Sequence, residues 1–355
     1  MANMDPSQDL HIHRPKSPYR QWLDQEGLPV HTGFFIEDLR TLDVKLWPRM
    51  GALGAYVLLE GSEERDDAYV LEISPGQCTK PERHLYEELI FVLNGRGATT
   101  VWVEGEKKQT LEWHAGALFS PPLNAWHQHF NGSGSEPARF VAVTTAPVMI
   151  NLLHDPDFIF NNNHVFRDRY AGEDNYFNGV GRSIGTRLWE TNLVPDVGTF
   201  KLQEYKERGK GNSYMRFEMS NNSMLAHVSE FPVGSYKKAH RHTAGAHVII
   251  VSGQGYSLMW LEGTEPKKFD WHEGSVIVPP DRWFHQHFNT GTTPARYLAL
   301  RWGSVKYPII SQSTRDVERV RKEDQIEYQD QDPAIHRQFE SECARFGAQV
   351  SMKIS

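Results

Sequence analysis

The stretch RHTAGAHVIIVSGQGYSLMWLEG, residues 241–263, repeats the pattern of RHLYEELIFVLNGRGATTVWVEG, residues 83–105. The two stretches align without a gap at a shift of 158 residues. The shift superimposes identical residues along both copies: His84 on His242, Gly95 on Gly253, Trp102 on Trp260, Trp113 on Trp271, and HQHFN of 127–131 on HQHFN of 285–289. Such a shared register is typical of an internal repeat, so the sequence predicts two copies of one domain.

Each copy has the composition of a β protein. Its segments are short, rich in β-branched and aromatic residues, and separated by Gly, Pro and Asn, as in LIFVLNGRG and TTVWVEG. Many such segments at close spacing predict a sandwich or a barrel. The GxG of 95–97 and 253–255 lies between two predicted strands with no helix after it, which excludes a dinucleotide loop. We therefore predict an all-β protein of two tandem barrels.

The repeat also divides the chain. A faint echo of FIEDLRTLDV (35–44) in LWETNLVPDV (188–197) places the start of each copy. Apolar residues at helical spacing in IHRQFESECARFGAQV predict one or two helices near the C-terminus. The expected parts are an N-terminal polar arm (1–34), a first barrel domain (35–150), a linker with a turn or two of helix (151–187), a second barrel domain (188–305) and a C-terminal helical tail (306–355).

The composition excludes several classes of protein. The formal net charge of -7 lacks the basic excess of nucleic-acid-binding proteins. No apolar run approaches the ~20 residues of a membrane span, and the N-terminus lacks the apolar core of a signal peptide. The two cysteines, Cys78 and Cys343, make no disulfide framework. We expect a cytoplasmic protein without nucleic-acid or membrane partners, and a homodimer or homotetramer because open barrel edges tend to pair.

Three histidines of the second copy have the spacing of metal ligands. Side chains at i and i+2 of a strand share a face, so His240 and His242 point the same way. His285 follows the Pro279-Pro280 turn and supplies a third imidazole from a neighbouring strand. Neutral imidazoles bind iron, zinc, copper and nickel. A single histidine is more often a core or surface residue, but three at this spacing favour a metal site.

These residues resemble the cupin superfamily, in its tandem form, the bicupins. The cupin pattern is G-x5-H-x-H-x3,4-E-x6-G followed by G-x5-P-x-G-x2-H-x3-N. The second copy matches it at Gly234, His240, His242, Gly253, Gly274, Pro280 (of Pro279-Pro280), His285 and Asn289. The first copy matches it at Gly76, His84, Glu88, Gly95, Gly116, Pro122, His127 and Asn131. The resemblance implies two double-stranded β-helix (jelly-roll) barrels.

Each copy departs from the pattern at one ligand position. In the first copy Glu82 replaces the first histidine, and in the second copy Ala246 replaces the glutamate. Counting with the longer x4 spacing would make His247 a fourth ligand. The gapless repeat instead aligns Ala246 with Glu88, and one step along a strand turns a side chain to the other face. We therefore favour His247 on the face opposite the metal.

Three histidines without a glutamate are similar to the gentisate dioxygenase group of bicupins, which includes salicylate and hydroxynaphthoate ring cleavers. That resemblance implies a non-haem Fe(II)-dependent dioxygenase that cleaves a C–C bond of a small aromatic hydroxy acid with O2. In that group the active metal is usually in the first barrel, whereas here the second copy has the intact triad. The alternatives are a Mn(II)-dependent decarboxylase, lyase or isomerase of the bicupin type, or a binding cupin without catalysis.

Further residues are candidates with an ordinary structural alternative. The first-copy set of Glu82, His84, Glu88 and His127 is either a manganese or iron site or the remnant of one. His287 and Arg301 are the catalytic candidates, the arginine as a clamp for a substrate carboxylate. His129, the twin of His287, equally suggests a structural role for both. The candidate substrate-pocket residues, each also compatible with core packing or a surface ion pair, are Arg216, Tyr256, Trp283 and Trp302.

Overall fold

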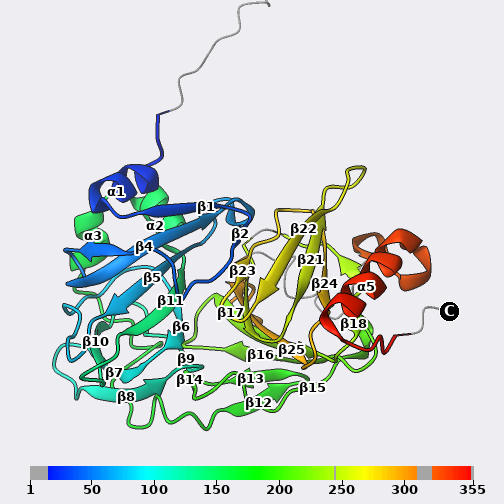
Figure 1. The fold of residues 1–355 in the computed structure, drawn as a ribbon. Coiled ribbons are helices and arrows are strands. Elements are labelled where there is room, and N and C mark those ends of the chain that lie inside the picture. Colours follow the sequence, from blue (N-terminus) through cyan, green and yellow to red (C-terminus); the bar gives the residue numbers. More distant parts are fainter. Residues whose placement is uncertain (1–14, 244, 310–321, 353–355) are drawn as a thin grey trace, which may run out of the picture.

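The computed structural model describes residues 15–243, 245–309 and 322–352 and shows two barrels side by side (Figure 1). The predicted all-β fold of two tandem barrels is confirmed, because strands form both bodies and helices lie only around them. The α-helices of the described residues are α1 (Pro18–Glu26), α2 (Ala146–Leu153), α3 (Pro156–Asn161) and α5 (Pro333–Phe346).

The first barrel consists of two sheets. The larger sheet has the order β1 (Val30–Gly33), β4 (Ala52–Leu59), β5 (Asp67–Ile73), β11 (Ala138–Thr144), β6 (Glu88–Asn94), β9 (Leu118–Phe119) and β14 (Leu193–Val194), with β3 (Lys45–Trp47) paired to β4. The smaller sheet has the order β10 (Trp126–Asn131), β7 (Arg96–Trp102) and β8 (Gln109–His114).

The second barrel repeats this arrangement. Its larger sheet has the order β12 (Arg182–Gly185), β13 (Leu188–Glu190), β16 (Ser213–Glu218), β17 (Met224–Phe231), β25 (Ala295–Trp302), β20 (His247–Ser252), β23 (Val276–Ile277) and β2 (Phe35–Ile36), with β15 (Gln203–Glu204) paired to β16. Its other sheet has the order β22 (Lys267–His272), β21 (Gln254–Trp260), β24 (Phe284–Asn289), β19 (Ala239–His240) and β26 (Gln325–Ile326), with β18 (Ser235–Tyr236) paired to β24.

The shift of 158 residues also relates two short strands near the start of the copies. The faint echo, which aligned 35–44 with 188–197, therefore had the wrong register. Phe35–Ile36 of β2 corresponds to Leu193–Val194 of β14, so the shift of 158 residues holds here too. Two arginines repeat the same clamp. Arg139 bonds Glu72 and the carbonyls of Leu39 and Leu42, and Arg296 bonds Glu230 and the carbonyls of Val197 and Phe200. The echo misled because these segments lack an alternating pattern that fixes their register.

The barrels exchange short strands, and this differs from the predicted boundaries. β2 pairs with β23 of the second barrel, whereas β14 pairs with β9 of the first. The two-residue strands pair only with distant partners, so the sequence gives no local sign of the exchange. The barrels also share one hydrophobic cluster, in which Val70 and Val143 of the first barrel join Phe217 and Leu298 of the second. The molecule is therefore built as a single unit.

The predicted N-terminal arm is not a free arm over its described part. Residues 1–14 lie outside the described residues, but helix α1 packs Tyr19, Trp22 and Leu23 into the core of the first barrel. The Ser17 hydroxyl caps this helix by accepting a hydrogen bond from the backbone N–H of Arg20. The segment PYRQWLDQE looks polar because its few apolar residues all point to one side.

The C-terminal helix α5 covers the outer face of the second barrel, with Phe339 and Cys343 buried against Phe288 (Figure 1). The predicted tail helix thus exists, while residues 310–321 and 353–355 of that tail lie outside the described residues.

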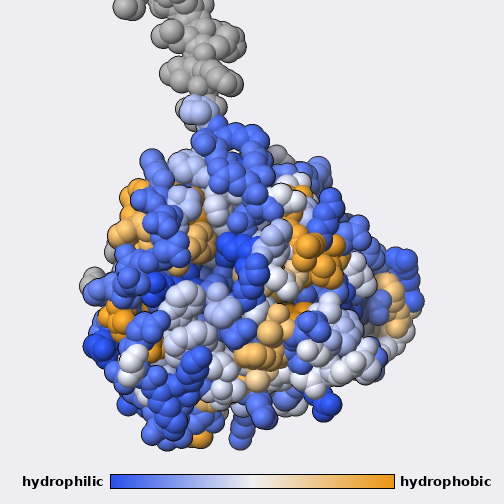
Figure 2. All heavy atoms as spheres, turned by 90° about the vertical axis from the view of Figure 1, so that its left-hand side faces the viewer, coloured by the Kyte–Doolittle hydropathy of each residue, from blue (hydrophilic) through white to orange (hydrophobic). Residues whose placement is uncertain are grey.

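No helix among the described residues is long and apolar enough to cross a membrane. On the face that carries the first barrel, hydrophobic residues are interspersed with hydrophilic ones (Figure 2), and the oligomeric state stays a prediction.

Candidate metal centre

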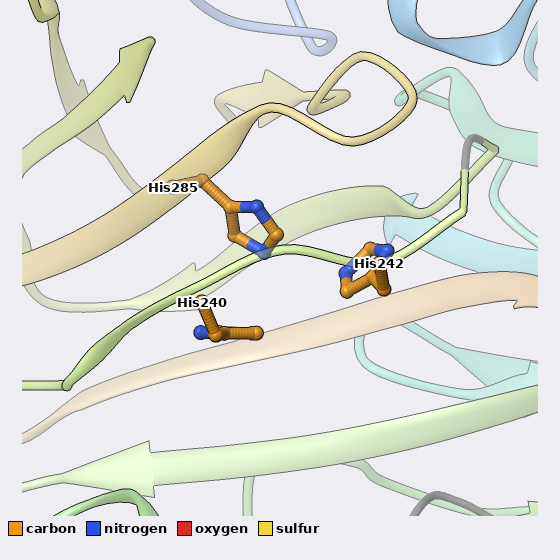
Figure 3. A group of neighbouring side chains, drawn as sticks. All are labelled: His240, His242 and His285. Carbon is orange, nitrogen blue, oxygen red and sulfur yellow. The ribbon is translucent and has the colours of Figure 1, made fainter. Parts of the chain in front are cut away.

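The three predicted histidine ligands of the second barrel lie together. Their ligand atoms are all within 4.8 Å of one another. His240 ends β19 and pairs across the sheet with His285 of β24, and His242 follows two residues later (Figure 3). The ring centroid of His285 lies 4.3 Å from that of His240 and 4.6 Å from that of His242. The i, i+2 spacing and the neighbouring strand therefore bring the imidazoles to one point.

Hydrogen bonds hold each of these imidazoles in a single orientation. The Nδ1 atoms of His240, His242 and His285 bond the backbone carbonyls of Lys238, Thr243 and Trp283 respectively. A carbonyl only accepts, so each Nδ1 carries the proton and each Nε2 keeps a free lone pair. Burial lowers the pKa of His240 and His285 well below the ordinary value, and that of His242 to about 4. At neutral pH the cluster offers three neutral donor atoms, which suits a divalent metal.

The triad lies in a small pocket inside the second barrel. Its volume is about 70 Å³, well below the roughly 300–1,000 Å³ of pockets for drug-sized ligands. Its charged lining residues are Arg208, Lys237 and Arg301, with no carboxylate among the described lining residues. The remaining lining residues are Tyr205, Tyr214, His227, Ser229, His240, His242, Ala246, Val248, His285, His287 and Tyr297. The pocket is thus small, and its described ionisable lining residues are histidines, tyrosines and basic residues.

Both catalytic candidates line this pocket. The Nε atom of Arg301 is buried and has no hydrogen-bond partner among the described residues. The Nδ1 atom of His287 bonds the Ser257 hydroxyl, which accepts a hydrogen bond from the Trp271 indole. Among the described residues Nδ1 is the only acceptor for the serine proton, so the hydroxyl donates to Nδ1 and the proton of His287 resides on Nε2.

The first barrel contains the same chain, from the Trp113 indole to the Thr99 hydroxyl to Nδ1 of His129. The second histidine of each HQHFN is therefore a fixed part of the fold. The sequence left its role open between structure and chemistry, and the geometry gives it a defined structural partner. In the second barrel that partner also orients the ring at the pocket wall.

Three predicted aromatic wall residues lie outside the pocket lining. Tyr256 stacks on Phe288 below helix α5, on the outer side of β21. Trp283 packs on Phe34, and the Trp302 indole donates to the carbonyl of Arg65 in the first barrel. Strand alternation explains Tyr256, because its neighbour Ser257 points inward. The structure gives no support for placing these three residues around a substrate.

Arg216 is intermediate between these cases. It is buried on β16 with its Nε atom unpartnered among the described residues, but it does not line the pocket.

His247 points away from the triad, because its neighbours Ala246 and Val248 line the pocket. It faces Asp66 of the first barrel, with Nδ1 3.9 Å from the carboxylate.

The first barrel brings its four candidate ligands together as well. The Nε2 atom of His84 lies 3.5 Å from Glu88, and that of His127 lies 3.6 Å from Glu82 and 3.8 Å from Glu88. His84 and His127 bond backbone carbonyls through Nδ1, as the other triad does. Nε2 of both histidines and Oε2 of Glu88 are buried without hydrogen-bond partners among the described residues. Orphaned donor atoms that converge in this way fit a metal ion.

The surroundings of the two ligand sets differ in charge. In the first barrel Arg49 forms ion pairs with Glu82 and Glu26, and the Tyr69 hydroxyl donates to Glu88. Although burial opposes it, Arg49 and His127 hold the pKa of Glu82 well below its ordinary value. The first set therefore has two carboxylates to balance a cation, whereas the second set is neutral and lies among cations.

The sequence pattern missed several residues of these sites. In the second barrel they are Arg208, Lys237, Ser229 and Tyr297, and in the first they are Arg49 and Tyr69. The motifs fix ligand spacing along two strands, but these residues come from other strands, from the break between β18 and β19, from a short 3-10 helix that contains Arg208 and from a turn that contains Arg49. No spacing signal identifies them.

Comparison with known proteins supports the fold. Residues 69–144 match the family model described as a cupin domain. No curated protein matches the sequence. Similar solved structures include an oxalate decarboxylase with 15% identity and a TM-score of 0.50, covering 76% of this chain and 77% of that one.

Two Bacillus subtilis oxalate decarboxylase variants give the same coverage and TM-score. A tryptophan-to-phenylalanine variant has 15% identity and a serine-to-alanine variant has 13%. At such identity the likeness concerns the fold only. Residues 69–144 thus match a cupin domain, and the chain has the fold of two tandem cupin barrels.

Proposed function

We propose that this chain is a metal-dependent bicupin enzyme whose second barrel converts a small organic acid. One observation supports this most strongly: three neutral imidazoles converge in a pocket of about 70 Å³ whose described charged lining residues are all cationic. Neutral ligands leave the charge of a bound metal unbalanced, and an anionic substrate would balance it. A divalent metal bound there would polarise a substrate carboxylate and, if it is iron or manganese, exchange electrons.

The residues of the pocket have distinct tasks in this proposal. His240, His242 and His285 hold the metal through Nε2. The free Nε–H of Arg301 binds a substrate carboxylate through a charge-assisted hydrogen bond. His287 holds a proton on Nε2, fixed there by Ser257, and donates a hydrogen bond to the bound acid. Enclosure in the barrel excludes water, which strengthens these contacts.

The Fe(II) dioxygenase is a second candidate. Ala246 supports it, because this residue lines the pocket where other cupins place a carboxylate ligand, and it leaves an all-imidazole set. The small pocket and the outward positions of Tyr256, Trp283 and Trp302 argue against an aromatic substrate. An O2-dependent reaction on a small aliphatic acid is compatible with the pocket. The carboxylate-rich first site favours Mn(II) or Fe(II) and the non-oxygenase alternative, a decarboxylase, lyase or isomerase.

Turnover of small acids tests the proposed function. The full chain, purified without oxygen and supplied with Fe(II) or Mn(II), is assayed on two- to four-carbon acids for CO2 release, O2 uptake and substrate loss. Oxalate belongs in this panel because proteins with this fold include an oxalate decarboxylase. We expect turnover that is lost on chelation of the metal and in His285→Ala. The exposed control His272→Ala should keep it. Turnover unchanged in His285→Ala contradicts the proposal, as does no turnover of any acid by either metal form.

A further inference from the structure

Lys237 is a buried lysine without a carboxylate partner among the described residues. Its exposed fraction is 2%, and no described carboxylate forms an ion pair with it. The ammonium group donates to the hydroxyls of Ser229 and Tyr297 and lies 4.3 Å from the centre of the Tyr297 ring. An ammonium has three N–H donors, so one remains without a partner among the described residues. A buried unpaired charge is costly, and such residues are usually retained for a function.

The neighbouring lysine shows the usual arrangement, in which the ammonium group pairs with a carboxylate. Lys238 lies on the other side of the chain and forms an ion pair with Glu327 at 2.7 Å. The twin position of Lys237 in the first barrel is Thr79, whose hydroxyl accepts from the backbone N–H of His129. The fold therefore needs no lysine at this position, and the second barrel alone places a cation there.

Lys237 lines the pocket of the triad together with Arg208 and Arg301. Arg208 is partly engaged, since it donates to the side chain of Gln325. Burial, with a contribution from Arg208, lowers the pKa of Lys237 well below its ordinary value. An anion beside it would stabilise the charged form.

We propose that Lys237 is a specificity-determining residue that binds a second anionic group of the substrate in the pocket that it lines together with the metal ligands. This inference rests on the proposed function and specifies its substrate: a small acid with two anionic groups. One group lies at the triad and Arg301, and the other meets Lys237 and the Tyr297 hydroxyl. A mono-acid leaves the ammonium unpaired in the barrel and binds more weakly.

Binding of simple acids tests the role of Lys237. Calorimetric titration of the full chain, loaded with Mn(II), compares malonate and succinate with propionate as the mono-acid of similar size. We expect at least one of the two diacids to bind roughly tenfold or more tightly than propionate, as a charge-assisted hydrogen bond provides. Lys237→Met should remove this preference while propionate binding stays. The matched control Lys238→Met removes an equal charge on the outer side and should keep the preference.

Several results would overturn the inference. These are equal diacid binding in wild type and Lys237→Met, no preference for diacids in the wild type, or inorganic phosphate binding more tightly than every diacid. Thermal unfolding and Mn(II) content of each variant are measured alongside, because a misfolded Lys237→Met would lose both. A lack of Mn(II) binding in the wild-type chain contradicts the proposed function, whereas a Lys237-independent diacid preference contradicts only this inference.

Discussion

Trp271, Ser257 and His287 form a buried hydrogen-bond chain that the first barrel repeats with Trp113, Thr99 and His129. Only the hydroxyl residue differs between the copies, serine in one and threonine in the other. Both hydroxyls are completely buried. The residue that orients a pocket histidine thus also stabilises the core, and this allows a direct test.

Removing the central hydroxyl should destabilise the protein. Ser257→Ala leaves the Trp271 N–H and Nδ1 of His287 buried without partners. Each unpaired group lowers the free energy of unfolding by about 1–3 kcal/mol. The control Ser257→Thr keeps the hydroxyl that the first barrel uses and should cost less. Urea unfolding measures both. Equal stability of Ser257→Ala and wild type would show that this chain does not hold His287 in place.

Asp66 and His247 are buried where the barrels meet, and their side chains have no hydrogen-bond partner among the described residues. Burial, with a contribution from Asp67, raises the pKa of Asp66 well above its ordinary value. A carboxyl group with a raised folded-state pKa costs stability as the pH rises above the unfolded-state pKa, because only the unfolded chain ionises freely. Below that pH both states are protonated and the cost vanishes.

Asp66→Asn should therefore stabilise the protein at pH 7 by at least about 1 kcal/mol and have a smaller effect at pH 4. Chemical unfolding at the two pH values measures this difference. The control Asp157→Asn changes an exposed carboxylate on α3. A gain that is the same at both pH values, or absent at pH 7, would contradict the sign of the shift.

Strands β7 and β21 each begin beside a glycine that another strand approaches closely. A Cβ atom at Gly255 would overlap the carbonyl oxygen of Phe288 and lie 2.7 Å from the Trp271 ring. Gly97 meets Phe130 and Trp113 in the same way. The second glycine of each GxG is thus required by the close antiparallel pairing of β21 with β24 and of β7 with β10, and not by a bound nucleotide.

Gly255→Ala should cost about 1–3 kcal/mol or more, because the backbone of β24 must move. Gly134→Ala is the matched control, since a Cβ there meets open space and the backbone is not in the left-handed region. Thermal or urea unfolding of the two variants checks the difference. Similar stabilities would mean that β24 adapts easily, which would also weaken the account of a fixed His285.

We expect the two barrels to unfold as one cooperative unit, because they exchange β2 and β14 and share a hydrophobic cluster. Scanning calorimetry of the full chain, stripped of metal, should show a single transition whose calorimetric and van't Hoff enthalpies agree. Gly97→Ala in the first barrel should lower the melting temperature of the whole molecule. Two separated transitions, with only one shifted by the substitution, would contradict this coupling.

The sequence predicted the parts that repeat and alternate. The shift of 158 residues and the i, i+2 spacing correctly brought His240, His242 and His285 together, as the repeat did for His84 and His127. Successive side chains of a strand point to opposite faces, so one inward-pointing residue places its two neighbours on the outer face. The same rule applied to Ser257 would have placed Tyr256 on the outside.

Other features depend on contacts that no local pattern encodes. The two-residue strands β2 and β14 take their partners from the other barrel, and the amphipathic helix α1 finds its apolar surface only in the folded domain. Lys237 and Lys238 interrupt the alternation between β18 and β19, so the sequence could not tell which lysine points inward. The sequence therefore predicted Arg301 in the pocket but not Lys237 or Arg208.

The most direct test of the central claim is the metal content of each barrel, measured by mass spectrometry on anaerobically purified chain. The variants are His285→Ala for the second barrel, His127→Ala for the first and exposed His272→Ala as the control. We predict close to two metal ions per wild-type chain, the loss of one in each barrel variant and no loss in the control. Full metal retention in His285→Ala would contradict a metal centre at the triad, and with it the proposed function of the second barrel.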